Sequence, residues 1–193
     1  MQNHTSGLNL CVFGHPSAAP ADVAAALGAS IGENASGEVS LAIFAINPNT
    51  GIDQATIDQW QSFDEFLTPR MIVVTHLDGN NADFDDAVML ATRVFDQVAT
   101  PYLVLHGDDG APAALINLED LSIRNYLHGV AVISESEPEH RELVAEFAQE
   151  YRELIESSGE DAFTAGLLFP AIPLNIDNGI GLDVLVSYLR KLQ

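Results

Sequence analysis

The sequence predicts an α/β fold with a mostly parallel central sheet covered by helices on both faces and a small inserted α+β subdomain. Two observations lead to this prediction. Apolar runs of strand length alternate with segments whose apolar residues recur at helical spacing, which is typical of a parallel sheet. Residues 101–160 break the alternation with short strands and one long helix. We therefore expect a single domain over residues 1–193, with the inserted subdomain at roughly 107–168.

The strands expected in the central sheet are predominantly apolar, as strands buried on both faces are. They lie at residues 8–13, 39–46, 70–75 and 171–175, and a further strand is expected at 102–105, within the stretch that breaks the alternation. Helices are expected at residues 21–27, 52–66, 84–98 and 179–192. The helix at 84–98 has the clearest spacing, with Phe84, Ala87, Ala91 and Phe95 on one face. Residues 28–37, rich in Gly, Ala and Ser, are expected to form a loop.

Within the insertion we expect short strands at 113–118, 121–125 and 129–133, joined by turns, and then a helix at 138–157. This helix is amphipathic. Its predicted buried residues are Leu143, Phe147, Tyr151 and Leu154. Its opposite face carries a row of glutamates at helical spacing, namely Glu139, Glu142, Glu146, Glu150 and Glu153.

The charge of the chain is strongly negative. Seven basic residues stand against 28 acidic ones, a formal net charge of −21. Contact with a nucleic-acid backbone or an anionic membrane would be repulsive, which argues against both as partners. The acidity is explained either by solubility or by a surface that meets a basic protein. A single cysteine, Cys11, and apolar runs too short for a membrane span predict a cytoplasmic protein.

Four stretches together carry a family resemblance. They are residues 8–21 (LNLCVFGHPSAAPA), 51–60 (GIDQATIDQW), 74–84 (VTHLDGNNADF) and 178–189 (NGIGLDVLVSYL). In this order, with the insertion before the last of them, they resemble the GTP-binding domain of elongation factor G, a translational GTPase. The resemblance implies a P-loop GTPase-like three-layer sandwich in degenerate and truncated form.

The resemblance also implies that the phosphate site is degraded. It aligns Gly14 and His15 with the first turn of the phosphate loop and Ala19 with its second glycine. Pro20 falls on the lysine and Ala21 on the hydroxyl residue that holds Mg²⁺. Proline supplies neither a cation nor an N–H group, and alanine cannot ligate a metal. The one lysine of the chain, Lys191, lies far along the sequence from this segment.

The base-reading motif is also altered. Asp78 matches the family's aspartate, whereas Thr75 and His76 replace the asparagine and lysine, and Pro173 stands where the family has a serine. The connection at 28–38 leaves no room for the family's first switch and its catalytic histidine segment. The resemblance therefore predicts a catalytically inactive pseudo-GTPase that is not an enzyme and has no cofactor.

Alternatives remain open at this stage. Gly14 and His15 could form an ordinary turn, and Asp78 could cap the turn before the helix at 84–98. His76, His106 and Cys11 show no metal-ligand spacing, so no metal site is expected. A residual nucleotide binder would use GTP and Mg²⁺; an enzyme of another class and a subunit of a homo-oligomer are the other possibilities. The resemblance suggests the ribosomal stalk protein as the basic partner of the glutamate row.

Overall fold

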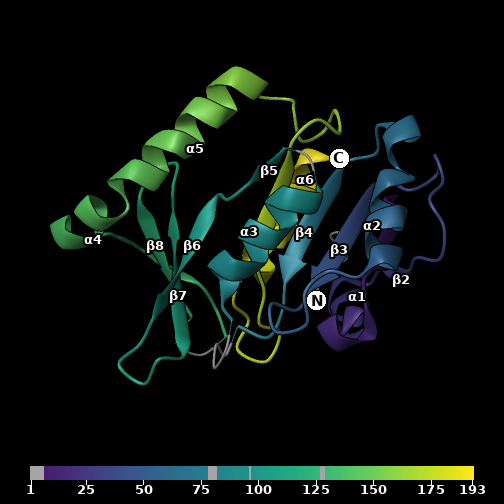
Figure 1. Ribbon diagram of the computed structural model, residues 1–193. Helices are drawn as coiled ribbons and strands as arrows, with labels where there is room; N and C mark the ends of the chain where they lie inside the picture. The colour runs from purple at the N-terminus through teal and green to yellow at the C-terminus, as the bar shows by residue number, and fades with distance from the viewer. Residues whose placement is uncertain (1–6, 78–81, 96, 127–128) are drawn as a thin grey trace.

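The computed structural model describes residues 7–77, 82–95, 97–126 and 129–193, and in them the chain forms two sheets (Figure 1). The larger sheet has six strands whose neighbours all run parallel. In order across the sheet the strands are β2 Ser30–Ile31, β1 Leu10–Phe13, β3 Leu41–Ile46, β4 Arg70–Val74, β10 Phe169–Pro173 and β5 Val98–Ala99. Every residue of β3, β4 and β10 is buried, as the apolar runs indicated. The predicted α/β class is confirmed.

The helices of the central domain are α1 Pro20–Leu27, α2 Gln54–Gln61, α3 Phe84–Val94 and α6 Leu182–Lys191. Two of them, α2 and α3, begin at aspartates that cap them. The Asp53 side chain accepts a hydrogen bond from the Thr56 N–H at the start of α2. Asp83 and Asp86 form a capping box at the start of α3, each carboxylate accepting the other's backbone N–H. Such caps satisfy N–H groups that have no partner inside the helix.

A smaller antiparallel sheet stands beside the central sheet, and α5 lies across it (Figure 1). In order its strands are β6 Tyr102–His106, β7 Pro112–Asn117, β8 Ser122–Asn125 and β9 Val132–Glu135, followed along the chain by α4 Pro138–Leu143 and α5 Ala145–Ser158. Val144 and Ala148 pack against Ile116 and Ile123 of the sheet. These elements span 102–158; the limits of 107 and 168 proposed for the subdomain stay a prediction.

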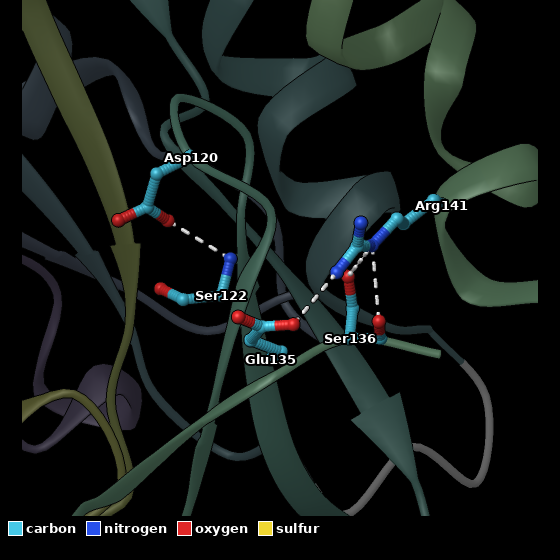
Figure 2. A network of polar contacts seen from close by, with 5 residues as sticks. All are labelled: Asp120, Ser122, Glu135, Ser136 and Arg141. Atoms are coloured by element: carbon cyan, nitrogen blue, oxygen red, sulfur yellow. Dashed lines mark hydrogen bonds and ion pairs between the residues drawn. The ribbon is translucent and has the colours of Figure 1, made fainter. Parts of the chain in front are cut away.

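The start of α4 is tied to the end of β9 by one arginine (Figure 2). Arg141 donates from Nε to the carbonyl oxygen and to Oγ of Ser136, at 3.0 and 3.1 Å, and its guanidinium lies 3.5 Å from the Glu135 carboxylate. Figure 2 also shows the turn before β8, where the Asp120 carboxylate accepts the Ser122 N–H at 2.9 Å. The contacts of Arg141 connect α4 to the end of β9.

The prediction of one helix at 138–157 with Leu143 and Phe147 buried is wrong in two respects. The helix is divided at Val144, which has a non-helical backbone conformation (φ −102°, ψ 4°). Its buried side is also different, because Leu143 and Phe147 are 74% and 52% exposed while Val144 and Ala148 are buried. The helix carries two apolar stripes, and the stripe with the smaller side chains allows the closer approach to the sheet. Spacing alone does not distinguish the two.

Two further expectations fail where short strands join the central sheet. The segment expected as a loop at 28–37 contains β2, which pairs with β1 through Cys11 and Val12. The helix expected at 84–98 ends at Val94, because Val98 pairs with Phe169 as part of β5. Both strands have only two residues. A run this short has too little periodicity to be recognised in the sequence.

A buried arginine lies within the aromatic core of the central domain. Arg70, only 3% exposed, places its guanidinium 4.8 Å from the Trp60 ring centre and 4.4 Å from that of Phe169. Its terminal nitrogen donates to the Trp60 carbonyl oxygen and to Asp64, both at 2.7 Å. Trp60 in turn stacks on Phe95 and meets Phe44 edge-on. The arginine therefore connects β4, α2 and β10.

We predict that Arg70→Ala lowers the free energy of unfolding by about 3 kcal/mol, because it removes a charge held between two rings and leaves a cavity. Asp64→Asn is the matched control. The Asp64 side chain is 62% exposed, so this change should cost about 1 kcal/mol or less. Urea unfolding measures both, and equal costs for the two variants would contradict the account.

All four tyrosines of the chain lie near the junction between the central domain and the antiparallel sheet. Tyr126 donates from its hydroxyl to the Asp183 carboxylate at 2.6 Å, and Arg124 contacts the same carboxylate at 3.0 Å. Arg124 also lies over the Tyr102 ring, 5.5 Å from its centre. Burial raises the pKa of every one of these phenols, to about 12 for Tyr151, and for Tyr126 the Asp183 carboxylate adds to the rise.

We predict that the folded protein loses stability as the pH rises above about 10, the ordinary tyrosine pKa. Because the folded-state pKa values are raised, the unfolded chain releases phenol protons first, so the stabilisation is complete below pH 10 and is lost above it. Each such tyrosine lowers the free energy of unfolding by up to about 1.4 kcal/mol per pH unit. Absorbance at 295 nm should rise together with the loss of circular dichroism; tyrosine ionisation near pH 10 in the folded protein would contradict this.

Candidate functional site

The carboxyl ends of the parallel strands bring most of the predicted site residues to one edge of the central sheet, where ligands of open α/β folds bind. Gly14 and His15 follow β1, Thr75 and His76 follow β4, and Pro173 ends β10. Ala19 precedes Pro20 and Ala21, which begin α1. The structure thus places these residues on one side of the sheet. Asp78 lies outside the described residues.

The segment after β1 forms a closed turn. Pro16–Ala18 is a 3-10 helix, in which the Ala18 N–H donates to the His15 carbonyl oxygen at 2.9 Å and the Ala19 N–H to that of Pro16 at 3.0 Å. The Ser17 N–H donates to Nδ1 of His15 at 3.2 Å. Pro16 and Pro20 have no N–H to offer. Three consecutive N–H groups of this segment, those of Ser17, Ala18 and Ala19, are therefore engaged within the turn, and the two prolines offer none.

Gly14 is required by the close approach of β3. Its φ of +138° is a conformation that L residues rarely adopt, and a Cβ atom there would meet the carbonyl oxygen of Ala45. Because Gly14 has no Cβ atom, the start of the turn can lie directly against the backbone of β3 at Ala45. Pro173 is approached in a similar way, because a Cβ on Gly181 would meet its carbonyl oxygen. Both positions are packed against backbone.

The carbonyl groups of the turn are held by residues from two other strand ends. The buried Asn47, after β3, donates from Nδ2 to the Ser17 carbonyl oxygen at 2.8 Å. The buried Thr75 donates from Oγ1 to the Ala18 carbonyl oxygen at 3.0 Å, and its oxygen lies 2.9 Å from Nδ1 of His76. The sequence did not predict a role for Asn47. Its position directly after the apolar run of β3 is the one feature that could have pointed to this edge of the sheet.

Thr50 adds a contact on the exposed side of the turn. Its hydroxyl lies 2.8 Å from Oγ of Ser17, which in turn lies 2.8 Å from Nδ1 of His15. Ser17 and Thr50 were likewise missed, because the sequence places them 33 residues apart. The turn is therefore fixed both internally and by the 47–50 segment.

A cavity of about 740 Å³ lies beside α1 at this edge. Its walls come from the ends of β4 and β10 and from one side of α1, and they are Ala19, Asp22, Val23, Ala25, Ala26, Thr75, His76, Leu174, Asn175, Ile176 and Asp177. Among the described residues, the lining includes the carboxylates Asp22 and Asp177 and no arginine or lysine. Its size suits a small ligand, but its charges oppose a phosphate.

The predicted partner surface lies elsewhere, on the helices over the antiparallel sheet. Glu139 and Glu142 belong to α4, and Glu146, Glu150 and Glu153 to α5; all five are exposed. Glu153 accepts a hydrogen bond from Gln149 on the same helix at 2.9 Å. The break at Val144 separates the first two glutamates from the other three.

The residues present at this site do not fit a GTP–Mg²⁺ complex. Pro20 and Ala21 start α1, so neither a lysine ammonium nor a hydroxyl is present at these positions. Among the residues that the structure describes, no group of three or more His, Cys, Asp and Glu side chains could hold a metal. In the same part of the chain, no helix has the length and apolar character needed to cross a membrane.

The architecture is that of a GTPase-like α/β domain with an inserted antiparallel subdomain, and the comparisons with known proteins agree. No protein-family model matches the chain. Elongation factor G-like proteins of two Mycobacterium tuberculosis strains, CDC 1551 / Oshkosh and ATCC 25618 / H37Rv, are 27% identical to it over 166 residues. That similarity covers 72% of this chain and 22% of theirs, so the chain spans about a fifth of the length of these curated relatives.

A crystal structure of a protein from Thermus thermophilus has the same fold, with a TM-score of 0.69 and 24% identity over 81% of this chain and 28% of the other. The chain is therefore similar in sequence to elongation factor G-like proteins over 72% of its length, in agreement with the resemblance of its motifs, and it shares the fold of the Thermus thermophilus protein.

We predict that Thr75→Val lowers the free energy of unfolding by about 1–2 kcal/mol, because the Ala18 carbonyl oxygen then loses a buried donor. Thr75→Ser keeps the hydroxyl and should lie closer to the wild type. Thr50→Val, at an exposed position, should change the free energy by about 0.5 kcal/mol or less. Urea unfolding compares the three, and a Thr75→Val variant as stable as the wild type would contradict this role.

Proposed function

We propose that the protein is a catalytically inactive, GTPase-related binding module, a pseudo-GTPase that keeps the fold without the chemistry. The observation that carries the proposal is the closed turn after β1. The N–H groups of Ser17, Ala18 and Ala19 donate within the turn, whereas a phosphate loop works by presenting such groups to the phosphates. Opening the turn would break these bonds together with those from Asn47 and Thr75.

Electrostatics supports the same proposal. A nucleoside triphosphate brings several negative charges, and the phosphate loop normally offsets them with a lysine and Mg²⁺. Here Pro20 stands at the lysine position, and Asp22 and Asp177 line the adjacent cavity of a chain with net charge −21. Phosphate binding would therefore meet repulsion without compensation. The proposal therefore includes that the protein acts without bound GTP or Mg²⁺.

The proposed role is to bind a basic protein partner through the exposed glutamate face of α4 and α5. Two elongation factor G-like proteins are similar in sequence, and the resemblance makes the ribosomal stalk protein a candidate partner. Direct nucleic-acid binding and membrane binding are disfavoured by charge. A cytoplasmic location is part of the proposal, and the oligomeric state is left to measurement.

A second candidate is a residual nucleotide binder that uses the cavity beside α1. The observation in its favour is the cavity volume of about 740 Å³ at the strand ends, next to Thr75 and His76. A base could enter between α1 and the 174–177 segment. The closed turn and the two carboxylates nevertheless favour the first proposal.

Thermal unfolding with GTP, GDP and ATP, each with and without Mg²⁺, separates the two candidates. A ligand at 100 times its dissociation constant adds about 2.7 kcal/mol, which moves the melting temperature by roughly 5–10 °C for a domain of this size. We expect no shift with any nucleotide.

A Mg²⁺-dependent shift with guanine nucleotides would overturn the pseudo-GTPase proposal. In that event Ala26→Tyr identifies the site, because Ala26 is an exposed residue of the cavity wall and a larger side chain there would occlude the space. Loss of the shift in this variant would then establish the second candidate.

A further inference from the structure

An apolar groove is lined by residues of α3 in the central domain and of α5 in the antiparallel subdomain. Its volume is about 450 Å³. Val88 and Met89 form one wall, Phe147 and Leu154 form the other, and Leu103 and Leu118 lie between them. None of these residues belongs to the strand-end site described above. The groove therefore offers a second and separate place for binding.

The walls of the groove contain large apolar side chains that are not buried in the protein core. Met89 is 51% exposed and Phe147 is 52% exposed, although both lie in helices with well-buried neighbours, Ala91 at 0% and Ala148 at 0%. Large exposed side chains that face one another across a groove are typical of a protein-binding surface. Leu118 below them is 2% exposed, so an inserted side chain would contact a packed apolar surface.

The rim of the groove is acidic on both sides. Asp85 of α3 and Glu150 of α5 line it directly, and Glu146 lies one turn before Glu150. Burial raises the pKa of the Asp85 carboxyl, and the nearby Asp83 and Asp86 carboxylates add to the rise while His106 opposes it. A cation of this region is Arg93, which lies 3.5 Å from Sδ of Met89. The balance of charge around the apolar walls is negative.

We propose that this groove binds an amphipathic helical segment of another protein, with apolar side chains between Met89 and Phe147 and lysine or arginine side chains against Asp85, Glu146 and Glu150. Two helical walls with apolar residues suit the binding of a helix through anchors at i, i+3, i+4 and i+7. The acidic rim selects a basic segment by charge complementarity. The inference rests on the proposed binding function and names where and how the partner binds.

The volume sets the scale of the contact. A space of about 450 Å³ lies in the range of about 300–1,000 Å³ typical of sites for small ligands. It accommodates a few side chains from one helical face, not a broad partner surface. A second copy of this chain would bring another formal charge of −21 to the same acidic rim, so self-association through the groove is disfavoured.

The test uses a fluorescein-labelled peptide of about 18 residues that forms a lysine-rich helix with leucines at i, i+3, i+4 and i+7. A scrambled peptide of the same composition has no apolar stripe, and a third peptide carries glutamate in place of lysine. Fluorescence anisotropy with the full chain should show saturable binding of the first peptide only. Equal binding of the scrambled peptide, or no binding of the first peptide, would overturn the proposal.

Variants locate the binding on the protein. Phe147→Ser and Met89→Gln should each weaken binding of the first peptide about tenfold, because each removes an apolar wall of the groove. Leu143→Ser is the matched control. Leu143 is another exposed apolar residue, 74% exposed, on α4 and outside the groove lining, so this change should alter the affinity less than about twofold. Asp85→Asn with Glu150→Gln should weaken binding and reduce its salt dependence.

Equal affinity of the Phe147→Ser variant and the wild type would overturn the groove proposal, as would equal weakening by Leu143→Ser. Thermal unfolding of each variant checks that the fold is kept. Sedimentation of the protein alone must show a monomer; a dimer that Phe147→Ser dissociates would mean that a second copy occupies the groove. The nucleotide experiment is independent, so failure here leaves the pseudo-GTPase proposal standing.

Discussion

The stacking of Arg70 between Trp60 and Phe169 is the interaction on which the central domain depends. It joins β4 to α2 and β10, and Trp60 continues the contact to Phe44 and Phe95. A buried guanidinium is stable only where rings and hydrogen-bond acceptors replace its water. Because β10 follows the whole antiparallel subdomain in the chain, this contact also closes the central sheet around the insertion.

The same parallel sheet explains how the turn after β1 is held in place. The carboxyl ends of β1, β3 and β4 lie at one edge, so the Ser17 and Ala18 carbonyl groups meet Asn47 and Thr75 there. In this turn the N–H groups of Ala18 and Ala19 bond within the segment, and the Ser17 and Ala18 carbonyl oxygens accept from Asn47 and Thr75. In the proposed function, the α/β architecture is kept and surfaces on α3, α4 and α5 serve for binding.

Much of the fold was predictable because local pattern and burial agree. The apolar runs of β3 and β4 and the Asp83 cap of α3 are encoded in neighbouring residues. The division at Val144, the exposure of Phe147 and the two-residue strands depend on contacts with distant segments. The same limit applies to the candidate site. The roles of Gly14 and Pro20 follow from their residue types, whereas the hydrogen bonds from Asn47 and Thr75 to the turn join residues that are distant in the sequence and are brought together only by the folded sheet.

The most direct test of the central claim is an NMR titration of the ¹⁵N-labelled protein with GDP and Mg²⁺, observing the backbone amides of Gly14, Ser17, Ala18 and Ala19. The account predicts that these signals do not move, and that the Ala18 and Ala19 amides exchange slowly with water because they are hydrogen-bonded within the turn. Saturable shifts confined to these amides would mean that the turn opens to accept a phosphate, and would contradict the account.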